Sequence, residues 1–133
     1  MSKKTIWITG GSTGIGKALA IKFASKGWNV AISARRAELL NELSNSYENI
    51  SSFPLDVTDK EKCKEVFNEI KNKYENIDIC FFSTGTWDPK KEKDIDVEQM
   101  EDVFKVNFFG TVNSIKAVEQ YFRDKKNGII TIV

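Results

Sequence analysis

The chain has 133 residues, of which 41% are hydrophobic and 29% charged, and its formal net charge is +1. This length provides one hydrophobic core and leaves no room for a separate substrate domain, so we expect one domain over residues 1–133. The balanced charge argues against nucleic acid as a partner, and no apolar run is long enough to span a membrane.

Five short apolar or β-branched runs alternate with longer helical patterns along the chain. We expect strands over residues 5–9, 29–33, 50–55, 77–82 and 129–133. Most of these runs are apolar on both faces, as in a parallel sheet that helices cover on both sides. With right-handed crossovers, this alternation predicts a Rossmann-type α/β fold, a doubly wound parallel sheet in the strand order 3-2-1-4-5.

The helical patterns carry boundary residues and apolar stripes. The first helix should end at Gly27 as a left-handed cap, and its expected stripe consists of Ile15, Leu19, Phe23 and Ala24. Thr58-x-x-Glu61 predicts a capping box, and the stripe behind it consists of Cys63, Val66, Phe67, Ile70 and Tyr74. Asp96-x-x-Gln99 predicts the cap of a longer helix that runs towards Arg123.

One long segment, residues 85–96, has no predicted helix or strand. It is rich in lysine and contains Pro89. A solvated loop and a lid over a ligand are both compatible with this composition.

Cysteine and histidine usage excludes several kinds of chemistry. The chain has two cysteines and no histidine, so we expect no common zinc site, no disulfide framework and no serine–histidine or cysteine–histidine catalysis. Cys63 and Cys80 should pack in the core of a protein in a reducing compartment. The start of the chain is not typical of a signal peptide, and we expect a cytoplasmic location.

A glycine-rich turn, residues 9–16, joins the first predicted strand to the first helix. Glycines allow a tight turn and a close approach of a pyrophosphate, and the helix N-terminus offers N–H groups to the phosphates. This placement favours a dinucleotide site over a merely structural turn. The expected cofactor contacts here are Gly10, Ser12, Thr13, Gly14, Ile15 and Gly16.

The end of the second strand indicates which cofactor binds. NAD-specific domains carry an acidic residue there, about 20 residues after the glycines, to bind the ribose 2′-hydroxyl. This chain has Ala34, Arg35 and Arg36 instead. An arginine can bind a 2′-phosphate through two hydrogen bonds, which favours NADP(H). The alternative is two solvated arginines at the start of a helix.

Four segments together resemble the short-chain dehydrogenase/reductase family. Thr9-Gly10-x-x-x-Gly14-Ile15-Gly16 is similar to its cofactor signature, and the resemblance covers essentially the whole chain. The other three segments follow in the family's order: Leu55-Asp56-Val57, residues 78–85, and Val106-Asn107-Phe108-Phe109-Gly110.

The resemblance implies roles for the matching residues. Asp56 and Val57 would contact the adenine, although Asp56 also suits a turn. Ser83, Thr84 and Gly85 would lie beside the cofactor, but Phe82, Ser83 and Thr84 depart from the family's Asn-Asn-Ala. Asn107 would be the supporting catalytic asparagine, whose backbone carbonyl holds a water; the alternatives are a solvent-facing residue or a helix kink.

The remaining catalytic residues of the family, a serine and a Tyr-x-x-x-Lys pair, follow its fifth strand, where this chain ends. Tyr121 and Lys125 have the right spacing, but Tyr121 precedes the fifth strand and would lie about 20 Å from Asn107 along one helix. We expect Tyr121 and Phe122 to be apolar packing near the helix terminus, and we reject catalysis by Tyr121 and Lys125.

We therefore expect a C-terminally truncated cofactor-binding portion of an NADP(H)-dependent oxidoreductase, inactive alone, whose full-length form acts on a carbonyl or alcohol substrate. The alternative is a non-catalytic NADP(H)-binding sensor or partner-binding protein. A methyltransferase is less favoured, since it usually has an acidic residue at the position of Ala34.

The helix around Asn107 carries more apolar residues than one stripe facing a sheet requires. Part of this surface should therefore face another chain or the missing helix. In the resembling family this helix and its successor pair with a neighbouring subunit, so we expect a homo-oligomer, and the isolated chain should dimerise or aggregate. The predicted strand over residues 129–133 would be an uncovered apolar edge and a second site of association.

Overall fold

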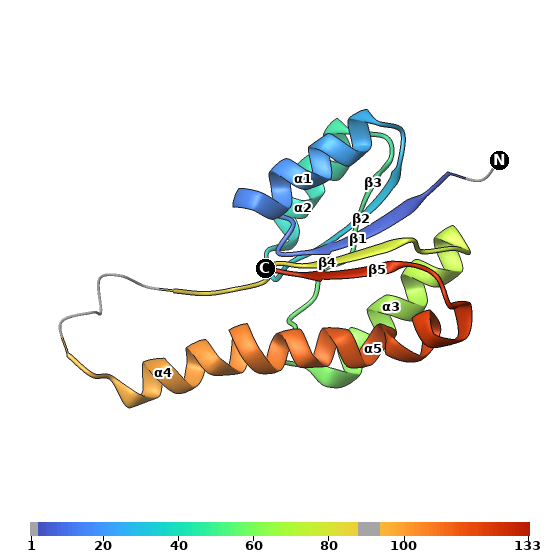
Figure 1. The fold of residues 1–133 in the computed structure, drawn as a ribbon. Helices are drawn as coiled ribbons and strands as arrows, with labels where there is room; N and C mark the ends of the chain where they lie inside the picture. Colours follow the sequence, from blue (N-terminus) through green and yellow to red (C-terminus); the bar gives the residue numbers. More distant parts are fainter. Residues whose placement is uncertain (1–2, 88–93) are drawn as a thin grey trace.

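The structure, a computed structural model, describes residues 3–87 and 94–133. Strands and helices alternate along the chain, as Figure 1 shows. The strands are β1 (Thr5–Thr9), β2 (Asn29–Ser33), β3 (Ile50–Ser52), β4 (Ile79–Phe82) and β5 (Ile129–Ile132). The helices are α1 (Gly14–Ser25), α2 (Ala37–Ser46), α3 (Lys60–Tyr74), α4 (Val97–Phe104), the π-helical turn η2 (Lys105–Phe109) and α5 (Gly110–Lys125).

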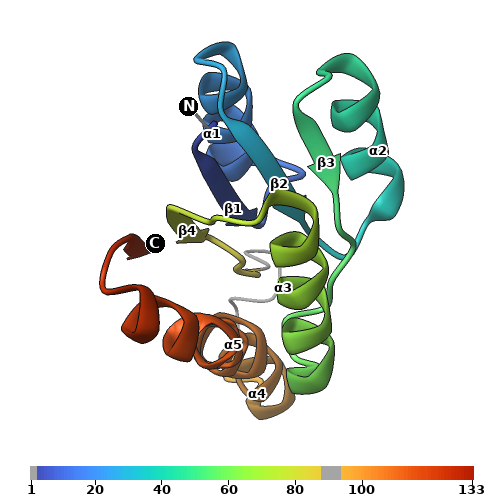
Figure 2. The same ribbon diagram turned by 90° about the vertical axis from the view of Figure 1, so that its right-hand side faces the viewer.

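The strands form one parallel sheet in the order β3-β2-β1-β4-β5, which confirms the predicted topology. Helices α1 and α2 cover one face of the sheet, and α3 and α5 cover the other (Figures 1 and 2). The order of the strands reverses between β1 and β4, so the carboxyl ends of these two strands flank the switch point where doubly wound proteins bind ligands.

The alternation of side chains along β1 divides the core into two layers. Ile6 and Ile8 pack beneath α1 and α2, whereas Trp7 packs on the opposite face with Phe67 and Phe82. The indole N–H of Trp7 is buried but donates to Ser33 Oγ at 2.9 Å. The largest side chain of this layer is therefore buried without an unpaired polar atom.

Three strands are shorter than the sequence predicts. β3 ends at Ser52 instead of residue 55, although the N–H groups of Phe53 and Leu55 still donate to the carbonyls of Ile32 and Ala34. β4 begins at Ile79 instead of residue 77, and β5 ends at Ile132.

The apolar stripe predicted for α1 is wrong in part. Gly16, Ala20 and Ala24 are its buried residues, whereas Ile15 is 64% exposed. Small residues on the buried face let α1 lie close to the sheet. Gly27 follows the helix with a φ of +82°, which confirms the left-handed cap.

The predicted capping box at the start of α3 is also wrong. Asp59 is the N-cap and accepts a hydrogen bond from Lys62 N at 3.1 Å. Thr58 does not cap the helix, because its hydroxyl donates to Asp56 instead. The helix itself is as expected, with Cys63, Val66, Phe67 and Ile70 buried.

The long helix predicted after Asp96 is present. Asp96 accepts a hydrogen bond from Gln99 N, and the helical path continues from α4 through η2 to the end of α5 at Lys125. The turn η2 is the one departure from α-helical geometry along this path. Residues 88–93, at the centre of the segment for which we considered a loop or a lid, lie outside the described residues.

Candidate functional site

The glycine-rich turn packs tightly between β1, β4 and α1. Gly10 has a φ of +69°, and a Cβ placed on it would lie 2.8 Å from the Ser83 carbonyl oxygen. A Cβ on Gly16 would clash with the Gly10 carbonyl oxygen. Only glycine fits these two positions, so the turn brings the backbone itself to the surface of the site.

The N-terminus of α1 faces the same place. Thr13 is the N-cap but makes no side-chain cap hydrogen bond, and the first turn contains no acidic residue. The positive end of the helix dipole and its first N–H groups are thus left to an anion.

These elements surround a cavity of about 410 Å³. All thirteen residues that the sequence predicts as cofactor contacts line it: Gly10, Ser12, Thr13, Gly14, Ile15, Gly16, Arg35, Arg36, Asp56, Val57, Ser83, Thr84 and Gly85. The sequence did not predict Leu55, Val106 and Val133 as cofactor contacts, although they also line the cavity. Nothing in the pattern of these apolar residues separates them from core positions.

The cavity wall past β2 is positively charged. Arg35 and Arg36 are exposed there next to Ala34, and neither guanidinium forms an ion pair within residues 3–87 and 94–133. Both are therefore available to an anionic group of a ligand.

Asp56 is a turn residue as well as part of the cavity wall. Its Oδ1 accepts hydrogen bonds from the Thr58 N–H at 3.0 Å and the Thr58 hydroxyl at 2.7 Å. Partial burial acts to raise the pKa of the Asp56 carboxyl, but these hydrogen bonds and the charges of Arg35 and Lys105 outweigh it. The pKa therefore lies below the usual value of 3.8, and the carboxylate is ionised at neutral pH.

Ser83 and Thr84 form the part of the cavity wall that follows β4. Ser83 donates through its hydroxyl to the Thr9 carbonyl at 2.7 Å, which fastens the end of β4 to the end of β1. Thr84 Oγ1 is buried and has no hydrogen-bond partner among the residues that the structure describes. The serine thus takes a structural role within the turn itself.

Asn107 lies in η2 and is held by its side chain. Its Oδ1 accepts from Thr86 N at 2.7 Å, and its Nδ2 donates to the Thr86 carbonyl at 3.1 Å. The Asn107 carbonyl accepts from the Thr111 hydroxyl at 2.9 Å. π-Helical turns are frequent at functional sites, and this one fastens the helix to the segment beyond Gly85. Sequence reasoning missed the contact with Thr86, since it joins two backbone groups to a side chain 21 positions away.

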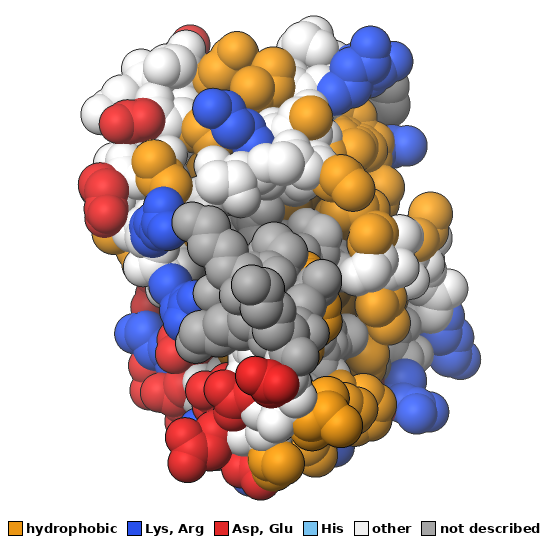
Figure 3. Space-filling view, turned by 90° about the vertical axis from the view of Figure 1, so that its left-hand side faces the viewer, with side chains coloured by type: hydrophobic (Ala, Val, Ile, Leu, Met, Phe, Trp, Pro, Cys, Tyr) orange, Lys and Arg blue, Asp and Glu red, His pale blue; other side chains and the backbone are white. Residues whose placement is uncertain are grey.

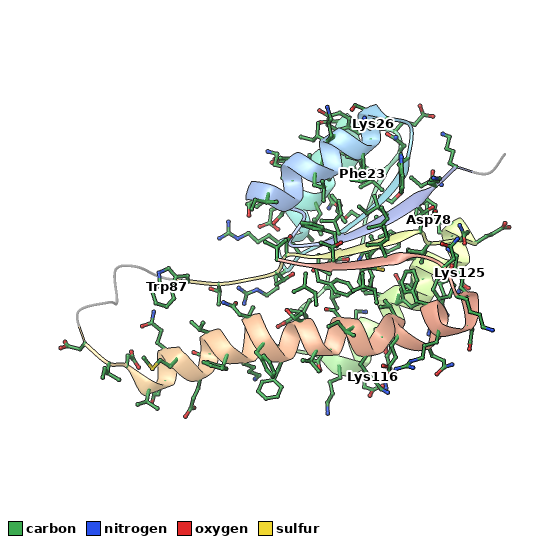
Figure 4. The ribbon with its side chains drawn as sticks, viewed as in Figure 1. Phe23, Lys26, Asp78, Trp87, Lys116 and Lys125 are labelled. Carbon is green, nitrogen blue, oxygen red and sulfur yellow. The ribbon has the colours of Figure 1, made fainter. Side chains whose placement is uncertain are left out.

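Tyr121 and Lys125 lie at the other end of the sheet, away from the cavity. The Tyr121 hydroxyl accepts from Ile77 N at 2.9 Å, and Lys125 Nζ donates to the Ile77 carbonyl at 2.6 Å. Lys125 also lies 3.8 Å from Asp78 Oδ1, and Figure 4 shows this pair far from Trp87, which follows the cavity wall past β4. Tyr121 and Phe122 pack against the core, as predicted, and the hydrogen bonds of Tyr121 and Lys125 fix the amino end of β4.

The cysteines and acidic residues offer no other centre of chemistry. Burial raises the pKa of the Cys63 thiol to about 11 and raises that of Cys80 as well. Across residues 3–87 and 94–133, no three Cys, Asp or Glu side chains gather as metal ligands. No helix of the described chain is long and apolar enough to cross a membrane.

A glycine-rich turn, an uncapped helix N-terminus and a cavity at the switch point of a parallel sheet define a dinucleotide-binding α/β domain. The chain matches the family model of the short chain dehydrogenases over residues 4–133, and it belongs to that family.

Individual relatives agree with this assignment. The chain is 33% identical to an uncharacterised oxidoreductase of Listeria monocytogenes over 98% of its own length and 54% of the relative's. It is 31% identical to the 2,3-dihydro-2,3-dihydroxybenzoate dehydrogenase of Bacillus subtilis, over 98% of the chain and 51% of the enzyme. The solved structure of ElxO with NADP bound matches with a TM-score of 0.88 and 30% identity, over 98% of this chain and 54% of that one. The chain thus spans about half the length of the relatives it matches.

Proposed function

We propose that this chain is the cofactor-binding portion of an NADP(H)-dependent oxidoreductase that acts on a small carbonyl or alcohol substrate. The observation that carries this proposal is the pair Arg35 and Arg36 on the cavity wall, beside Ala34 and without a carboxylate at the end of β2. A similar structure with NADP bound supports the choice of cofactor.

The residues present fit such a cofactor. The α1 N-terminus and the turn at Gly10 would hold the pyrophosphate, Arg35 and Arg36 the 2′-phosphate, and Asp56 the adenine. NADP(H), when bound, supplies or accepts the hydride. Asn107 would position the segment beyond Gly85 through its two hydrogen bonds to Thr86.

A comparison of the two cofactors tests the proposal. We expect NADPH to bind more tightly than NADH, and Arg35→Ala to lower NADPH affinity about tenfold or more, because a charge-assisted bond to phosphate is lost. Fluorescence titration measures both affinities. Arg123→Ala is the matched control, since Arg123 is an exposed arginine near the end of α5. Equal affinities of the unmutated chain for NADPH and NADH would refute the choice of NADP(H).

We propose further that the 133 residues alone do not transfer hydride. Of the three tyrosines, only Tyr121 has a lysine four positions on, and its hydroxyl is bonded to Ile77 N at the opposite end of the sheet from the cavity. We expect no NADPH-dependent carbonyl reduction above background by this chain. Two free, buried cysteines fit a reducing compartment such as the cytoplasm.

The apolar face of the long helix supports a homo-oligomer. Figure 3 shows apolar side chains gathered over α4, and the exposed apolar residues of α4, η2 and α5 are Val97, Met100, Phe104, Phe108, Phe109 and Val112. A continuous apolar surface of this kind is typical of an interface. We expect light scattering to detect a dimer or larger species, and Phe104→Glu to shift it towards the monomer; a monomer at all concentrations would contradict this expectation.

A further inference from the structure

The peptide bond between Val57 and Thr58 is held at both of its ends. Its carbonyl oxygen accepts a hydrogen bond from Asn113 Nδ2 in α5 at 2.9 Å. Its N–H, on Thr58, donates to Asp56 Oδ1 at 3.0 Å. A continuous path of hydrogen bonds therefore leads from the side chain of Asn113 to the carboxylate of Asp56.

Close packing holds the same loop against α5. A Cβ on Gly110 would lie 2.5 Å from Val57 Cγ2, so a larger residue there would push the loop away. Val57 is only 4% exposed, and Cys63 Sγ lies 3.6 Å from its carbonyl oxygen as a weak second donor. Since Asn113 is half-buried, water competes weakly for the carbonyl, and the amide is its strong donor.

The orientation of the Asp56 carboxylate follows from these contacts. Both hydrogen bonds from Thr58 end on Oδ1, so Oδ2 is the oxygen that remains to accept a bond from a base in the cavity that Asp56 lines. Without Asn113, the Val57–Thr58 peptide could rotate, and the N–H that orients the carboxylate would turn with it.

We propose that Asn113 is a positioning residue that orients the Asp56 carboxylate and thereby sets the preference of the site for adenine. The inference rests on the proposed function, because it requires a dinucleotide in the cavity. Adenine carries a 6-amino group that donates to a carboxylate, whereas hypoxanthine carries a carbonyl oxygen at the same position and would be repelled. The ratio of affinities for the two bases therefore reports the orientation of Asp56.

The experiment titrates NADPH and its hypoxanthine analogue into the unmutated chain and into Asn113→Ala. We expect the unmutated chain to prefer NADPH about tenfold, the effect of one hydrogen bond to a charged group, and Asn113→Ala to prefer it about threefold or less. Alanine is the better helix former, which offsets the stability lost with the hydrogen bond. Gln120→Ala, which removes an amide on the same helix that bonds Asp124 at 2.8 Å, should retain the full preference.

Two further variants secure the interpretation. Asn113→Asp keeps the size of the side chain but removes the N–H donor. It should therefore reduce the preference for NADPH over the hypoxanthine analogue, as Asn113→Ala does. Asp56→Ala should abolish the preference, and adding Asn113→Ala to it should have no further effect on the ratio, because both residues act through one carboxylate.

The outcomes separate this inference from the proposed function. If Asn113→Ala and Asn113→Asp weaken binding of both dinucleotides equally and keep the ratio, Asn113 is only structural and the inference is overturned while the proposed function stands. If the unmutated chain does not bind NADPH, the proposed function fails and the inference fails with it.

Discussion

Removal of the Tyr121 hydroxyl should destabilise the fold without touching the cavity. In the folded chain this hydroxyl accepts a hydrogen bond from the Ile77 N–H at 2.9 Å, and Ile77 is 0% exposed. In Tyr121→Phe the ring can still pack edge-to-face against Phe67, at a centroid distance of 5.4 Å in the native chain. The buried N–H of Ile77 loses its acceptor, which costs about 1–3 kcal/mol.

Urea unfolding measures this loss in the free energy of unfolding, and thermal unfolding measures the fall in melting temperature. For a chain of this size, each 1 kcal/mol lowers the melting temperature by about 3–5 °C, so a fall of about 3–15 °C is expected. Tyr74→Phe is the matched control: its hydroxyl bonds the side chain of Ser51 at 2.7 Å rather than a backbone N–H. We expect its loss to be about 1 kcal/mol or less.

The same variant tests whether Tyr121 takes part in chemistry. NADPH affinity should equal that of the unmutated chain, because the Ile77 N–H and Lys125 place Tyr121 at the amino end of β4, opposite the cavity. A loss of NADPH binding at unchanged stability, or carbonyl reduction that Tyr121→Phe abolishes, would refute the structural role assigned to this tyrosine.

Three more predictions follow from the site and the core. Gly16→Ala would press a methyl group against the Gly10 carbonyl oxygen, so we expect a loss of stability of about 1–3 kcal/mol and loss of NADPH binding; binding retained in titration would contradict the tight turn. Burial acts to raise the pKa of Asp56, yet the hydrogen bonds and positive charges around it lower that pKa below 3.8. Its contribution to stability is therefore complete above pH 3.8 and is lost as the pH falls through the folded pKa, and Asp56→Ala should flatten acid unfolding in that range; an unchanged acid profile would contradict this assignment. Burial raises the pKa of the Cys63 thiol to about 11 and that of Cys80 too, so iodoacetamide should label both only after unfolding; rapid labelling of the folded chain would show that the core opens there.

The sheet and the cavity could be predicted because their patterns are local. The glycine-rich turn, the end of β2 at Arg35 and the Asp56 turn each follow a strand directly, and the carboxyl ends of parallel strands meet at one edge of the sheet. The crossover rule fixed the hand of each connection, and the strand order followed from the Rossmann-type fold that the glycine-rich turn indicates. The predicted contacts line one cavity because the topology of the sheet brings the ends of these strands together.

Other contacts could not be predicted, because they join side chains to backbone groups far away in the sequence. Asn113 bonds the Val57 carbonyl 56 positions away, and Tyr121 bonds Ile77 N 44 positions away. Neither partner differs in its sequence pattern from an ordinary helix or strand residue. The wrong capping box at Thr58 has another cause. Thr58 and Asp59 are adjacent, and both residue types can cap a helix. Asp59 caps α3, whereas the Thr58 hydroxyl donates to Asp56.

The pairing of β1 with β4 has a consequence for how the chain comes apart and closes. Thr5 pairs with Asn29 across a short connection, whereas Ile6 pairs with Ile79 across one roughly three times as long, and closing the longer loop costs about 1 kcal/mol more in chain entropy. By this measure the seam between β1 and β4 costs more to close than the seam between β1 and β2. Since the cavity straddles this seam, with Arg35 on one side and Thr84 on the other, a bound dinucleotide would tie the two halves together. At a free concentration of a hundred times its Kd, the dinucleotide would raise the free energy of opening by about 2.7 kcal/mol. Hydrogen exchange in β4 and β5 should slow most when NADPH is added, because a dinucleotide that contacts both halves stabilises the pairing between them.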